Sequence, residues 1–126
     1  MDDISPQGAV RLARVLFPKA FKILAYRPGT REAHTMSGGT TVEFMPAMVV
    51  VQLGETPASG YTLNNPKGEG HSLREAVAAL SRCTYIVTNE AREKVRKAIG
   101  YDDTTAGVLT AYTTVGRDVP DDDRED

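Results

Sequence analysis

The feature that most constrains the fold is an uninterrupted apolar run over residues 47–51, Ala-Met-Val-Val-Val. Valine favours extended backbone, and a strand that is apolar at consecutive positions has to be covered on both faces. The run therefore predicts a central strand within an extended segment over residues 41–53. Pro46 lies inside this segment and has no amide hydrogen to donate, so we expect a bulge or a strand start there.

The first helix is predicted near the start of the chain. Ser5 is a good N-cap residue, and Pro6 occupies the first helical position, where proline is favoured. The apolar residues that follow keep a helical phase as far as Leu24. Pro18 interrupts this phase, and we expect it to kink the helix or to break it tightly.

Two further helices are marked by their ends. A Ser-Leu-Arg-Glu sequence at residues 72–75 is a capping box, and the helix it starts should end near Arg82. Thr88 or Asn89 should cap another helix, which Gly100 closes.

Shorter segments complete the predicted sheet. β-forming residues predict strands over residues 31–36, 61–63, 84–87 and 107–115, and turn-forming residues predict loops over 37–40, 54–60 and 64–70. The order of elements indicates an α+β fold, with a mainly antiparallel sheet of four to five strands and about three helices packed on it.

Length and composition narrow the class of protein. The 126 residues fit one domain, which we expect over residues 1–117, followed by a disordered acidic tail over 118–126. With 40% hydrophobic residues the chain is not wholly disordered. No apolar run approaches the roughly 18 residues of a membrane span. The acidic start is unlike a secretory signal, so we expect a soluble, cytoplasmic protein.

Charge is distributed unevenly along the chain. Residues 118–126 carry six acids and one arginine, whereas residues 4–31 contain six basic residues and no acid. These six are the predicted partner-binding residues: Arg11, Arg14, Lys19, Lys22, Arg27 and Arg31. The first four should lie on the solvent-facing half of the first helix, where they would steer an acidic partner. The alternative is a solvated helix face and a solubilising tail.

Few residues have the pattern of a chemical site. His71 and Ser72 precede a helix N-terminus, which suits anion binding, and they form a candidate ligand site. Cys83, the single cysteine, should be a buried structural residue. Asp102 and Asp103 supply too few ligands for a metal ion. We therefore expect no metal, no cofactor and no catalytic residues.

Three functions follow from these observations. The leading prediction is a small non-catalytic binding or regulatory protein, of the inhibitor, adaptor or accessory type, whose macromolecular partner is a protein. One alternative is a nucleic-acid-binding protein that uses the basic face of the first helix and is masked by the acidic tail. The isoelectric point of 5.7 counts against it, because nucleic-acid-binding domains usually exceed about 9. The other is a small-ligand-binding protein or enzyme with a pocket near His71.

Self-association is a further prediction for the partner. The apolar strand around Val49 would pair across a homo-oligomer interface if it lay at a sheet edge.

Overall fold

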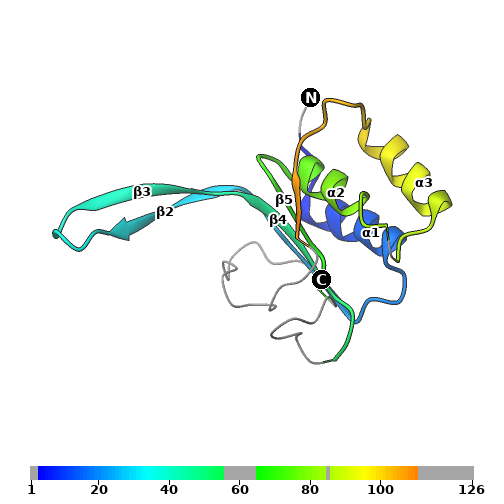
Figure 1. Ribbon diagram of the computed structural model, residues 1–126, viewed down its shortest axis with the longest axis horizontal. Helices are drawn as coiled ribbons and strands as arrows, with labels where there is room; N and C mark the ends of the chain where they lie inside the picture. The colour runs from blue at the N-terminus through cyan, green and yellow to red at the C-terminus, as the bar shows by residue number, and fades with distance from the viewer. Residues whose placement is uncertain (1–2, 56–64, 85, 111–126) are drawn as a thin grey trace.

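The computed structural model describes residues 3–55, 65–84 and 86–110 of the chain. Within them, a four-stranded antiparallel sheet, a two-stranded hairpin and three helices form an α+β fold (Figure 1). In chain order the elements are α1 (Pro6–Leu16), β1 (Lys22–Tyr26), β2 (Gly29–His34), β3 (Thr40–Met45), β4 (Ala47–Gln52), β5 (Lys67–Gly70), α2 (Leu73–Leu80), α3 (Asn89–Ile99) and β6 (Val108–Thr110). The predicted fold class is confirmed. No helix in these ranges is long and apolar enough to cross a membrane.

The sheet has the order β1-β4-β5-β6, so β4 is an interior strand, as predicted. All six residues of β4 are buried, which explains its continuous apolar sequence. Val49 and Val51 join the main core beneath the helices, whereas Met48 and Val50 belong to a second apolar cluster. Val49 is therefore not at an edge, and the condition for strand pairing across a homo-oligomer is not met.

The helices form one layer on the sheet. α1 and α2 lie on one face of the strands, and α3 packs beside them (Figure 1). Their apolar stripes meet in the main core, where the largest fully buried side chains include Leu16, Phe17, Leu73 and Val95.

The first helix is shorter than its apolar phase predicted. It ends at Leu16, and residues 22–26 form strand β1 instead of a second helical segment. Phe17 has left the helical region, since proline disfavours helical backbone at the preceding residue and removes a helix hydrogen bond. The predicted helical phase to Leu24 was therefore wrong beyond Pro18. The apolar residues at 23–26 are explained by the burial of strand β1 and not by a helical stripe.

The predictions for two of the shorter segments were also wrong. Residues 64–70 were predicted as a loop, but residues 67–70 form β5, in which two glycines weakened the strand pattern. Thr84, Ile86 and Val87 do not form a strand; they lead into the Thr88 cap of α3. The predicted strand at 61–63, the end of the predicted strand at 107–115, and the acidic tail lie outside the described residues.

The predicted N-caps of the three helices and the glycine that ends α3 are confirmed. Ser5, Ser72 and Thr88 each accept a backbone hydrogen bond in the first turn of their helices, and Gly100 ends α3 with a φ of +66°. A contact between residues far apart in the sequence also stabilises the N-terminus of α2. The carboxylate of Asp3 accepts hydrogen bonds from the backbone amides of Leu73 and Arg74, at 2.8 and 2.9 Å.

Strands β2 and β3 project away from the sheet as a hairpin, which we call the arm (residues 29–45; Figure 1). Tyr26 lies opposite Met48 in the sheet, and Gly29 lies opposite Met45 in the arm. Two residues separate these pairs on each strand, so the register continues without a bulge. Each gap contains a proline, which lacks an amide donor, and the ladder of hydrogen bonds is interrupted there. Of the two alternatives for Pro46, the strand start is the right one.

Candidate functional site

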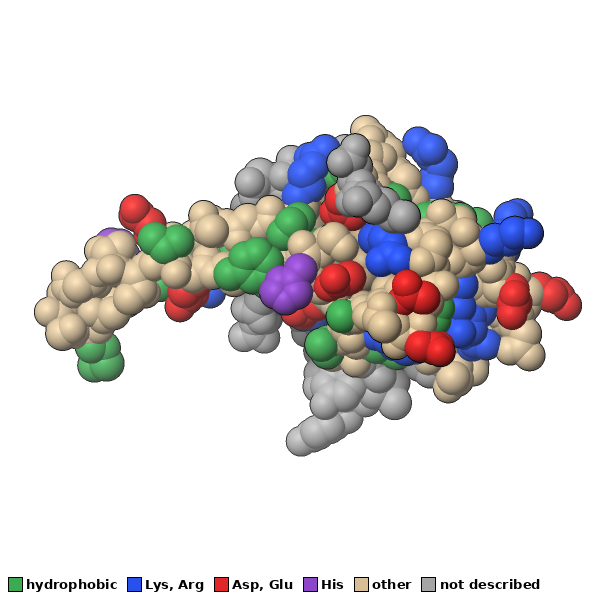
Figure 2. All heavy atoms as spheres, turned by 90° about the horizontal axis from the view of Figure 1, so that it is seen from above, with side chains coloured by type: hydrophobic (Ala, Val, Ile, Leu, Met, Phe, Trp, Pro, Cys, Tyr) green, Lys and Arg blue, Asp and Glu red, His purple; other side chains and the backbone are tan. Residues whose placement is uncertain are grey.

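The six predicted partner-binding residues lie on several elements. Arg11 and Arg14 are on α1, Lys19 follows the helix, Lys22 begins β1, Arg27 joins β1 to β2, and Arg31 is on the arm. They do not form one helix face, because α1 ends before Lys19. On the face shown in Figure 2, lysine and arginine side chains lie over the body in separate groups. Their contact with a partner stays a prediction.

Arg14 and Arg31 show that side chains of this set have internal partners. Arg14 donates a hydrogen bond to the backbone carbonyl of Ala20, which fixes the turn after α1. Arg31 forms an ion pair with Glu43 across the arm, with 3.2 Å between Nε and the carboxylate oxygen. Arg11 and Lys19 are exposed. The predicted basic surface is thus smaller than the count of residues suggests.

Other arginines hold the helix ends together. Arg74 Nε donates to the carbonyl of Ile99 at 2.6 Å, and Arg92 Nε donates to the carbonyl of Ser81 at 2.7 Å. Both carbonyls lie at helix C-termini, where intrahelical donors are missing. The guanidinium of Arg96 lies 4.2 Å from the ring centroid of Tyr101, a cation–π contact. These arginines therefore have structural roles, which weakens the argument for a phosphate-binding surface.

His71 lies in a hollow where the arm meets the sheet. We call it the basal hollow; it measures about 380 Å³, and its lining includes Phe44, Pro46, Glu69, His71, Glu75 and Val108. The ring of His71 packs against that of Phe44, with 5.4 Å between centroids. Two carboxylates share this lining and would repel an anion. Ser72 uses its hydroxyl oxygen to accept the amide of Glu75, so it acts as a helix cap.

The candidates for an enzyme site lie in different environments. Cys83 is buried in the main core, as predicted. Asp102 is exposed in the turn after α3, where Thr104 donates hydrogen bonds to its carboxylate from both hydroxyl and amide, and these bonds lower the pKa of Asp102. In the part of the chain that the structure describes, no cluster of histidine, cysteine and acidic side chains is arranged to hold a metal ion.

The arm carries an apolar surface that the sequence analysis did not identify. Met36 at its tip is fully exposed, and Val42 and Phe44 on β3 are 70% and 53% exposed. Val42 lies opposite Glu32 and Phe44 opposite Thr30, so these side chains share one face of the arm, which we call the Val42 face. Figure 2 shows hydrophobic side chains along the arm and at its base. The sequence feature that could have predicted this surface is the alternation of apolar and polar residues over 42–44, which is typical of a strand with one apolar face.

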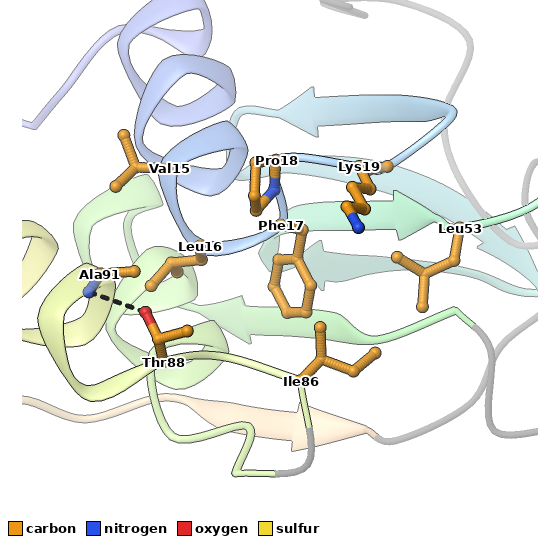
Figure 3. Close-up of a pocket in the computed structure, with 10 residues that line it drawn as sticks. Val15, Leu16, Phe17, Pro18, Lys19, Leu53, Ile86, Thr88 and Ala91 are labelled. Atoms are coloured by element: carbon orange, nitrogen blue, oxygen red, sulfur yellow. Dashed lines mark hydrogen bonds between the residues drawn. The ribbon is translucent and has the colours of Figure 1, made fainter.

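A second hollow lies at the other end of the sheet. This distal hollow measures about 360 Å³, and its apolar lining includes Val15, Leu16, Phe17, Ala20, Leu53 and Ile86. In Figure 3 the Phe17 ring projects from the end of α1 toward Ile86, with Leu53 beside it. Lys19 contributes the charged group of the lining, and the side chain of Ile86 is 41% exposed.

The described residues therefore present two apolar features, the Val42 face of the arm at one end of the sheet and the distal hollow at the other. The Val42 face consists of exposed side chains, whereas the distal hollow combines the buried Leu16 and Phe17 with the exposed Ile86. No protein family model, curated protein or solved structure matches this chain.

Proposed function

We propose that this protein is a non-catalytic binding protein that acts by association with a protein partner through its arm. The observation that carries the proposal is the exposure of Met36, Val42 and Phe44 on an element that projects from the body. Exposed apolar patches on a folded protein commonly mark interaction sites. A two-stranded hairpin is only marginally stable by itself in water, and a partner that covers one of its faces would stabilise it.

The charge of the arm favours a protein over a nucleic acid. On its two strands, Arg31 is balanced by Glu43, and Glu32 adds a further negative charge. Affinity for nucleic acid comes largely from basic side chains on phosphates, which such an arm cannot supply. Among the residues that the structure describes, no further strand pairs with the outer edge of β2 or β3, which form a sheet of two. A protein partner would therefore be able to form main-chain hydrogen bonds with the arm as well as contacts with its apolar side chains.

The proposal is tested by capture from the native source on the full chain, at about 0.05 M and about 0.5 M salt. Apolar association through the arm should survive high salt and be lost in Val42→Asp. The matched control is Thr41→Asp, which places the same charge on the opposite face of the same strand. A second variant replaces the exposed Arg11 and Lys19 by glutamine.

The outcomes separate the candidate surfaces. Capture that is unchanged in Val42→Asp but lost at high salt and in the Arg11→Gln, Lys19→Gln variant would overturn the arm and favour the basic surface. Capture that disappears after nuclease treatment would favour the nucleic-acid alternative.

A further inference from the structure

The exposed apolar side chains of the described residues gather at two ends of the molecule. Met36, Val42 and Phe44 are on the arm, and Val108 lies at its base in the basal hollow. The other two large ones, Phe21 and Ile86, are 54% and 41% exposed. Ile86 lines the distal hollow, and Phe21 directly follows Ala20 of its lining. The described residues thus present an apolar projection at one end of the molecule and an apolar hollow at the other.

Strand β1 places these two surfaces on opposite sides of the body. Its first residue, Lys22, lies opposite Gln52, next to Ala20 and Leu53 of the distal hollow. Its last residue, Tyr26, lies at the end from which the arm leaves. Five residues of extended strand measure about 16 Å, and the arm extends away from that end. The arm therefore points away from the distal hollow of its own chain.

The chemistry of the two surfaces is complementary. The Val42 face presents an apolar side chain with Glu32 directly opposite it on the neighbouring strand. The distal hollow presents an apolar lining with one charged residue, Lys19, at its exposed side. The arm therefore carries an acid next to Val42, and the hollow carries a base in its lining. Opposite charges of this kind set orientation and select the partner.

We propose that the partner is a second copy of this chain, whose distal hollow receives the Val42 face of the arm. This inference rests on the proposed function and names the partner for the same arm. The contact joins different surfaces of the two copies, so each bound copy still has a free arm or a free hollow. Such head-to-tail contacts build rings when the rotation closes and filaments when it does not.

The first test is sedimentation velocity on the purified full chain over a range of concentrations. The unmodified chain and Thr41→Asp should form oligomers, whereas Val42→Asp and Ile86→Asp should each remain monomeric. Mixing the last two variants should give a dimer with one copy of each and nothing larger. In that dimer the intact arm of Ile86→Asp occupies the intact hollow of Val42→Asp, and the remaining two surfaces are blocked.

The second test reverses the charges and leaves the apolar contact in place. Glu32→Lys and Lys19→Glu should each weaken self-association by about tenfold or more, because like charges then meet at the contact. The double variant should return to within about threefold of the unmodified chain, since the pair is restored with its signs exchanged. Both side chains are exposed, so circular dichroism should show the same fold throughout.

Three results would overturn the inference. One is a monomer at every concentration up to about 1 mM, which corresponds to a Kd weaker than millimolar. Another is an oligomer that survives in both Val42→Asp and Ile86→Asp, and the third is a double charge variant with no recovery. A monomer that still captures another protein through Val42 would overturn only the self-association, and the proposed function would stand.

Discussion

At the scale of single residues, two glycines permit the contact between α2 and the sheet. A Cβ atom on Gly68 would lie 2.0 Å from the carbonyl oxygen of Ala76, and one on Gly107 would lie 2.4 Å from that of Glu75. Gly107 also has a φ of +132°, which side chains other than glycine rarely adopt. Gly68, one of the two glycines that weakened the strand prediction for β5, is therefore required by tertiary packing.

Replacing Gly68 by alanine should lower the free energy of unfolding by about 3 kcal/mol or more, because the helix backbone must move to admit the methyl group. Urea denaturation of the full chain measures this change. The control is Gly29→Ala, where no atom lies within 4 Å of the added Cβ. There we expect no loss, or a gain of about 0.4–1 kcal/mol from the restricted unfolded chain. Equal stability of both variants would contradict the close contact between α2 and β5.

The carboxyl group of Asp102 should titrate below its ordinary value of 3.8, because Thr104 hydrogen bonds favour its charged form. A lowered pKa in the folded state means that this group contributes stability above its unfolded pKa. That contribution is lost as the pH falls through the folded pKa. NMR titration of the side-chain carboxyl carbon measures the midpoint. Thr104→Ala should move the midpoint back toward the ordinary value; a midpoint that does not move would show that Thr104 is not the cause.

At the scale of elements, the arm lies outside the main core of the body, although its Phe44 ring packs against His71. The main core takes residues from the helices and from β1 and β4, whereas β2 and β3 contribute none. Pro28 and Pro46 interrupt the ladder at the same level on the two strands. The arm therefore adds little to the stability of the body. Its own stability would increase if a partner covered one of its faces.

Removing the arm should leave the body folded. Residues 28–46 can be replaced by Asn-Gly, a two-residue turn that closes an antiparallel hairpin between Arg27 and Ala47. The removed residues contribute nothing to the main core, but the packing of Phe44 against His71 is lost. We therefore expect the free energy of unfolding to fall by about 0.5–1.5 kcal/mol at most. Self-association measured by sedimentation should disappear in the same variant. Failure of this shortened chain to fold would contradict the separation of arm and body.

At the scale of the whole molecule, the proposed head-to-tail association would make the stability of the protein depend on its concentration. Binding that occurs only between folded copies raises the thermal midpoint as protein concentration rises. The midpoint of the unmodified chain should therefore increase over a hundredfold range of about 1–100 μM, while that of Val42→Asp should stay constant. Differential scanning fluorimetry measures both. A parallel increase in the two proteins would mean that the arm is not the associating surface.

Elements with strong local chemistry were predicted well. The caps at Ser72, Thr88 and Gly100 and the buried strand over residues 47–51 follow from neighbouring residues alone. The prediction failed at Leu24, because an apolar stretch that continues past a proline fits a buried strand as well as a helix. Periodicity cannot separate the two over a few residues.

The arrangement of the candidate residues was predicted less well, and their role in binding stays a prediction. The basic residues were placed on one face by extending α1, and their grouping was lost with the end of that helix. The exposed side chains of Val42 and Phe44 were not identified, since exposure depends on whether another layer covers the strand.

By itself, the sequence determined the fold class, the helix caps and the central position of β4, because these depend on residues within a turn or a strand of one another. Only the tertiary structure decided which surfaces stay open. Asp3 caps a helix 70 residues away, and arginines bond carbonyls on other helices. Such contacts join groups that are distant in the chain. A local sequence pattern cannot predict them, because it does not show which distant groups the fold brings together.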